Sequence, residues 1–136
     1  MSLIEWKDEL SVGIDEIDAQ HKKWIAIINE LHNSIMEGDS LASLEKTVKE
    51  VEEYTFFHFR EEEKLLEKVN YPELSRHSRV HFSFRQEIIR VKSAILSGEV
   101  VLRTQVMSVL KNWLLDHIMK EDMKYADFIR ERSKKA

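Results

Sequence analysis

The sequence predicts an all-α protein: an up-down-up-down antiparallel four-helix bundle with an N-terminal arm and a broken C-terminal helix. Two observations support this fold class. The 136 residues include only three glycines and one proline, and apolar residues seldom alternate as they do in a β-strand. Four long segments instead carry apolar residues at steps of three and four, which places those residues on one face of a helix. Short turn sequences separate the segments, and helices joined in this way pack as antiparallel neighbours.

The arm spans residues 1–15, and the first helix is expected to begin at Asp15 or Asp18 as its cap. Its inward-facing stripe contains Ile17, His21, Trp24, Ile28, Leu31 and Ile35. The sequence EGDS forms the following turn. The second helix has a stripe of Leu44, Val48, Val51, Thr55, His58, Glu62, Leu65 and Val69, and the sequence NYP ends it.

The third helix carries Leu74, His77, His81, Phe84, Ile88, Val91 and Ile95, and it ends at Ser97-Gly98. The stripe of the fourth helix is Leu102, Val106, Val109 or Leu110, Trp113 and His117. Beyond His117 this stripe would continue into lysines, which are poor core residues. A stripe of Ile118, Asp122, Tyr125 and Ile129 fits better, so the pattern predicts a slip of one residue near HIMKED.

Five histidines and a glutamate occupy inward-facing positions, and the turn positions predict that they share one depth. In an antiparallel bundle, residues equally far from a turn lie at the same level. The midpoint between His21 and His58 falls in the turn at residues 38–40. The midpoint between the His58/Glu62 and His77/His81 pairs falls at 69.5, beside the turn at residues 70–72, and that between His77/His81 and His117 falls at residue 98. His32 lies roughly 16 Å along the helix from His21 at 1.5 Å per residue, so it is expected to lie outside this layer.

Such a layer favours a metal centre, because buried ionisable groups are costly unless they are paired or bind metal. Imidazole and carboxylate suit zinc, copper, iron and nickel, and a single tetrahedral zinc needs only four ligands. Two ions that share the two oxygens of Glu62 fit better. A second bridging carboxylate is expected from the fourth helix. Glu121 would face the layer on an unbroken helix, whereas the slip of one residue favours Asp122.

The residues of this layer resemble those of the hemerythrin family. The matching motifs are IDAQHKKW with His21, HFREEE with His58 and Glu62, His77-x-x-x-His81, and HIMKED with His117 and Asp122. The N-terminal pattern W-x-x-x-L-S-V-G-I-x-x-I-D adds to the match, which covers nearly the whole chain.

The resemblance implies two non-heme Fe ions bridged by Glu62, Asp122 and an oxo or hydroxo group. One iron would be bound by His77, His81 and His117, and the other by His21 and His58. The resemblance also implies reversible binding of dioxygen, as a ligand of the two-histidine iron, for transport, storage or local supply. We therefore expect an oxygen-binding protein rather than an enzyme. It could deliver oxygen to an unidentified oxygen-using partner.

Composition argues against several other classes of function. The chain has no cysteine, a net charge of −4 with interspersed charges and no Gly-rich phosphate loop, so neither a thiolate site nor a nucleic-acid partner is expected. No apolar run approaches the roughly 18 residues of a membrane span. The acidic start lacks a signal peptide, so we expect one cytoplasmic domain over residues 1–136. Two alternatives stay open: an oxygen-sensing, redox-sensing or iron-handling module, and a di-iron enzyme acting on peroxide or nitric oxide.

Overall fold

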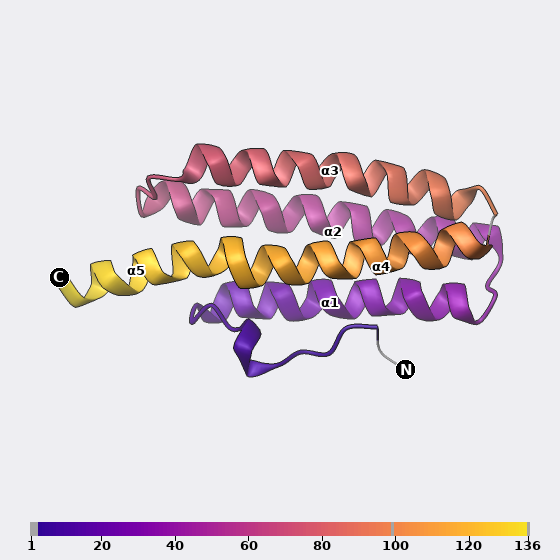
Figure 1. Cartoon of the computed structure of the whole chain (residues 1–136), viewed down its shortest axis with the longest axis horizontal. Helices are drawn as coiled ribbons and strands as arrows, with labels where there is room; N and C mark the ends of the chain where they lie inside the picture. The colour runs from indigo at the N-terminus through magenta and orange to yellow at the C-terminus, as the bar shows by residue number, and fades with distance from the viewer. Residues whose placement is uncertain (1–2, 99, 136) are drawn as a thin grey trace.

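The computed structural model describes residues 3–98 and 100–135, with the side chains of residues 100–102 and 133–135 left aside, and its described part contains helices and no β-strand. Three helices, α1 (Asp15–Met36), α2 (Leu41–Lys68) and α3 (Leu74–Leu96), pack with a fourth rod. That rod consists of α4 (Val100–Asp116), a π-helix (His117–Asp122) and α5 (Met123–Lys135). Figure 1 shows the rods side by side, with α5 extending beyond the ends of the other helices. The predicted all-α four-helix bundle is confirmed.

The turns lie where the sequence predicted them, and two of them have the same geometry. Helices α1 and α2 both end in a Schellman motif, in which two backbone N–H groups beyond the helix bond back to its last turn. The left-handed residue is Gly38 after α1 (φ 71°) and Asn70 after α2 (φ 56°). Ser40 then caps α2 by accepting a hydrogen bond from the backbone N–H of Ser43 at 3.2 Å. These compact turns hold the antiparallel helices in register.

The predicted inward-facing stripes of α1 and α3 are buried almost throughout. Leu74 is the exception, because it is half-buried in the first turn of α3. In α2 the stripe is buried as predicted as far as Glu62. Beyond that residue Leu66 is fully buried and Leu65 is half-buried, so the predicted continuation through Leu65 was wrong by one position.

The predicted stripe of α4 is correct at Leu110, one of the two options for its position, and at His117, but Met107 and Leu114 are buried in place of Val106 and Trp113. Met107, Leu110 and Leu114 are buried, whereas Val109 is 51% exposed and Trp113 is half-buried. The side chain of residue 102, which was predicted to begin the stripe, lies outside the described residues. Helix α4 carries apolar residues on several faces, so periodicity alone could not select the inward face. None of the described helices is nevertheless long and apolar enough to span a membrane.

The N-terminal arm is fixed to α1, along which it runs in Figure 1. The side-chain amide of Asn29 accepts from the backbone N–H of Ile4 at 2.9 Å and donates to its carbonyl at 2.8 Å. The carboxylate of Asp18 accepts from the backbone N–H of Val12 at 2.8 Å. Helix α1 begins at Asp15, near the predicted start, but its N-cap is Ile14, so neither Asp15 nor Asp18 caps the helix as predicted. Asp18 instead holds the arm through Val12.

Candidate metal centre

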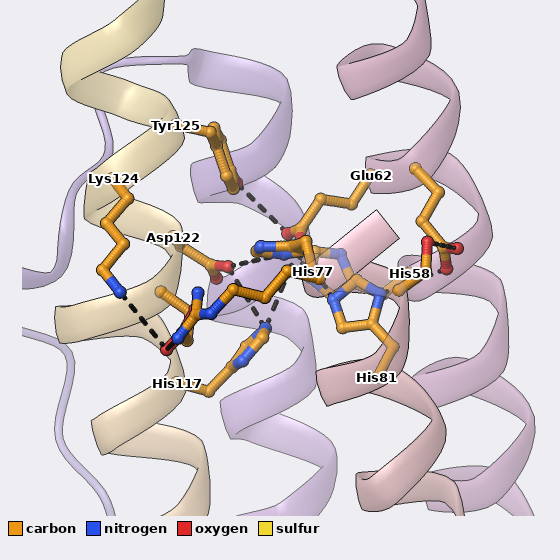
Figure 2. Close-up of polar contacts among 12 residues, drawn as sticks. His58, Glu62, His77, His81, His117, Asp122, Lys124 and Tyr125 are labelled. Carbon is orange, nitrogen blue, oxygen red and sulfur yellow. Dashed lines mark hydrogen bonds and ion pairs between the residues drawn. The ribbon is translucent and has the colours of Figure 1, made fainter. Parts of the chain in front are cut away.

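All seven side chains that the sequence singled out meet in one buried layer of the bundle. They are His21 from α1, His58 and Glu62 from α2, His77 and His81 from α3, and His117 and Asp122 from the π-helix. None is more than 3% exposed. Figure 2 shows His77, His117 and Asp122 converging on Glu62. His32 is half-buried and belongs to none of these contacts.

Glu62 stands between two groups of imidazoles. Its Oε1 lies 2.6 Å from Nε2 of His77 and 3.0 Å from Nε2 of His81, with Nε2 of His117 at 3.9 Å. Its Oε2 lies 3.2 Å from Nε2 of His58 and 3.8 Å from Nε2 of His21. One carboxylate oxygen therefore faces three histidines and the other faces two.

Asp122 reaches the layer because the helix widens at this point. Its Oδ1 lies 3.1 Å from Nε2 of His117 and 3.3 Å from Nε2 of His77, and its Oδ2 lies 3.2 Å from Nε2 of His21. On an α-helix Asp122 would point about 140° away from His117. The i→i+5 bonding of a π-helix brings residues five apart onto one side. The predicted slip is thus a π-helix within a continuous rod.

Glu121, the alternative that an unbroken helix would have favoured, points elsewhere. It forms a two-point ion pair with Arg76 of α3, with N–O distances of 2.6 and 2.9 Å. This contact lies at the surface, where the Arg76 side chain is 42% exposed. Glu121 therefore ties the π-helix to α3 without entering the buried layer.

The donor atoms of the layer fit two neighbouring metal ions. One donor atom from each of Glu62, His77, His81 and His117 forms a set within 4.8 Å, and His21, His58 and Glu62 form a second set. Several of these atoms are buried without a hydrogen-bond partner among the described residues. They are both ring nitrogens of His21 and His117, Nε2 of His58 and both carboxylate oxygens of Asp122. Buried polar atoms are normally paired, and unpaired nitrogens beside carboxylates form a suitable ligand shell.

Comparison with known proteins agrees with this geometry. Residues 12–129 match the family model of the hemerythrin HHE cation binding domain. The chain belongs to the hemerythrin family. It is 35% identical to bacteriohemerythrin of Stenotrophomonas maltophilia and 32% identical to that of Pseudomonas aeruginosa, in each case over 96% of this chain and 84% of the relative.

Two further comparisons extend the likeness beyond bacteria and to solved structures. The chain is 32% identical to a hemerythrin-like protein of Naegleria gruberi, over 91% of this chain and 92% of that protein. A solved structure of a hemerythrin leucine-to-alanine mutant superposes with a TM-score of 0.83 at 23% identity. It covers 93% of this chain and 97% of the solved chain, which shows that the two share a fold.

In this hemerythrin-family layer, carboxylates and imidazoles stabilise each other's charged forms when no metal is bound. Burial by itself would lower the pKa of each imidazole. The carboxylates of Asp122 and Glu62 outweigh burial and raise the pKa of His21 and His117 to about 9 and that of His77 to about 10. Burial raises the pKa of both carboxyl groups, but the histidines hold it well below the ordinary range. Metal ions must therefore displace protons when they bind.

His58 differs from these three histidines. Burial lowers its pKa despite the nearby carboxylate of Glu62. Its other ring nitrogen, Nδ1, lies 2.7 Å from the side-chain oxygen of Gln20. An imidazole that stays neutral, with the proton on Nδ1, leaves Nε2 free as a ligand atom.

Two residues behind the layer were missed by reasoning from the sequence. Gln20 contacts Nδ1 of His58, and the Glu63 carboxylate accepts from Nδ1 of His81 at 3.1 Å. Both lie off the inward-facing stripes, so periodicity did not select them. The sequence did offer one signal: Gln20 directly precedes His21, and Glu63 directly follows Glu62. A residue next to an inward-facing ligand lies at the edge of the helix, where it can reach a histidine of the neighbouring helix.

Aromatic side chains enclose the layer. Phe59 stacks on His81 with ring centroids 3.8 Å apart, and Trp113 stacks on His117 at 4.7 Å. Tyr125 is fully buried and donates its hydroxyl to a Glu62 oxygen at 3.1 Å. These rings pack against the imidazoles and the bridging carboxylate of the layer.

Proposed function

We propose that this hemerythrin-family protein binds dioxygen reversibly at a non-heme di-iron centre. Its role would be to carry, store or locally supply oxygen, including delivery to an oxygen-using partner. The observation that carries the proposal is the division of the layer around Glu62 into a three-histidine and a two-histidine donor set. Membership of a family of cation-binding hemerythrin domains supports iron as the metal and dioxygen as the ligand.

In this proposal all seven residues hold the metal pair. His77, His81 and His117 would bind one iron, and His21 and His58 the other. Glu62 and Asp122 would bridge both, because each has one oxygen toward each donor set. The bound pair supplies a site for dioxygen and the electrons that hold it reversibly. The two-histidine position has fewer protein donors, so the open coordination position belongs there.

The donor chemistry favours binding over oxidation of a substrate. Ferritin-like di-iron sites take a glutamate from each of two helices and a Glu-x-x-His pair from each of the other two. Here five imidazoles, each of which is neutral once it binds metal, and only two carboxylates are present. A less anionic ligand set stabilises the ferrous pair. This feature suits a binding protein rather than an enzyme.

A metal and anion titration tests the proposal. Protein reconstituted anaerobically with Fe(II) is expected to hold about two irons per chain. After oxidation, azide followed by its visible absorption should saturate at one anion per iron pair, because one coordination position is open. One iron per chain, or two azides per pair, would contradict the assignment of the two donor sets.

A further inference from the structure

We propose that hydrogen bonds behind the ligands make the two iron positions electronically unequal, with Glu63 and Gln20 as the positioning residues that set the difference. This inference rests on the proposed di-iron centre and adds to it. The three-histidine position would be the electron-rich one, which is oxidised first. The two-histidine position would stay electron-poor and open to a ligand.

Glu63 places a negative charge behind the three-histidine position. Its Oε2 accepts a hydrogen bond from Nδ1 of His81 at 3.1 Å, and its Oε1 accepts one from the hydroxyl of Ser78 at 2.6 Å. The Glu63 side chain is 29% exposed and lines a surface groove of about 540 Å³, so it remains solvated and ionised. A carboxylate behind a metal-bound histidine orients the ring and raises its basicity.

Gln20 occupies the corresponding place behind the two-histidine position, but it is neutral. Its Oε1 lies 2.7 Å from Nδ1 of His58. Because the amide oxygen carries no net charge, it fixes the ring of His58 without making it a much stronger donor. Hydrogen bonds to charged groups are roughly twice as strong as neutral ones, so the difference between Glu63 and Gln20 is substantial.

Tyr125 adds to the asymmetry through the bridging carboxylate. Its hydroxyl donates to Oε2 of Glu62 at 3.1 Å, and this is the oxygen that lies 3.2 Å from Nε2 of His58. The other oxygen, Oε1, faces His77 and His81 and receives no such bond from Tyr125. A hydrogen bond withdraws electron density from the oxygen that accepts it. The Tyr125 contact therefore weakens donation toward the two-histidine side, in the same direction as Gln20 and Glu63.

The test exchanges the two partners. Glu63→Gln removes the charge and keeps an acceptor, while Gln20→Glu places a charge behind His58. The first one-electron oxidation of the ferrous pair, with the electron passing to an electrode, reports on the three-histidine position. The azide dissociation constant of the oxidised protein reports on the two-histidine position. Partners of this kind change metal binding by about 10- to 100-fold.

We expect E63Q to raise the first midpoint potential by about a tenfold shift in equilibrium constant, about 59 mV for one electron, with azide affinity changed less than twofold. Gln20→Glu should instead change the other readout. Azide should bind about tenfold more weakly, and the first midpoint potential should move little. Ser78→Ala and Glu63→Asp, which keep the charge, should stay near the wild-type potential. Their melting temperatures and iron contents identify any effect that is merely structural.

The outcomes separate this inference from the proposed function. If the wild-type protein does not bind two irons, both the proposed function and this inference are wrong. If the wild-type centre forms but both exchanges change both readouts equally, or change neither, the two positions are not set apart by these residues. In that case the inference alone is overturned.

Discussion

Substitutions of Asp122 and Glu121 test whether the π-helix positions Asp122 in the buried layer. The two acidic residues are adjacent in the sequence, but one is buried among imidazoles and the other forms an ion pair at the surface. Asp122 is fully buried with three imidazole nitrogens within 3.3 Å, whereas Glu121 pairs at the surface with Arg76. Asp122→Ala removes a proposed bridging ligand and a buried counter-charge. Glu121→Ala removes a partly exposed two-point ion pair, which contributes less to stability than the buried charges around Asp122.

The size of the Asp122 effect follows from its contacts. Removing one partner of a buried charge network costs about 3–5 kcal/mol. Repulsion from Glu62 already disfavours the ionised form of Asp122, so the lower end of this range applies. At about 3–4 °C per kcal/mol for a chain of this length, the metal-free Asp122→Ala variant should melt about 10 °C below the wild type.

Thermal melts of the metal-free variants near pH 6.5, together with iron analysis after anaerobic loading, measure both consequences. We expect Asp122→Ala to lose most of its iron and Glu121→Ala to keep the wild-type content. Equal iron loss in the two variants, or a larger fall in melting temperature for Glu121→Ala, would refute the role of the π-helix in positioning Asp122.

Three more predictions concern the layer and the core beside it. His77→Ala should lose iron while His32→Ala keeps it, as iron analysis would show, and equal loss would mean that depth in the bundle does not define the site. In the metal-free protein, the three imidazoles with raised pKa stabilise the fold fully below their unfolded pKa of about 6.5 and lose this effect as pH rises through 9 to 10. The melting temperature should therefore fall from pH 7 to 10 in metal-free but not in iron-loaded protein, and parallel profiles would contradict this. Thr55→Val should lower the free energy of unfolding in urea by about 1–3 kcal/mol, because the buried Trp24 indole N–H donates to the Thr55 hydroxyl at 2.9 Å; Thr55→Ser, which keeps the acceptor, is the control.

The depth of the polar layer could be predicted because its determinants are local. Gly38, Ser40 and Asn70 are residues whose backbone or capping preferences mark a turn. Once those turns are placed, ionisable residues on apolar stripes fall at one level by counting. Polar residues at core positions also stand out against their apolar neighbours.

Other features depended on information that periodicity does not contain. In α4 the sequence left Val109 and Leu110 open as alternatives and placed Trp113 inward where Leu114 is buried, because only packing distinguishes neighbouring apolar residues. Gln20 and Glu63 resemble ordinary surface residues, and only the position of the neighbouring helix gives them partners. The slip before Asp122 was predictable, but its form depends on backbone hydrogen bonding.

The measurement that most directly tests reversible oxygen binding is the visible spectrum of the iron-loaded, reduced protein through repeated exposure to air and argon. The proposed centre predicts charge-transfer bands that appear in air and disappear under argon. The same amplitude should return in each cycle, with iron held at about two per chain. Bands that grow once and persist under argon, or an absorbance that decays steadily toward the oxidised form, would show that the centre consumes oxygen and would contradict the proposed function.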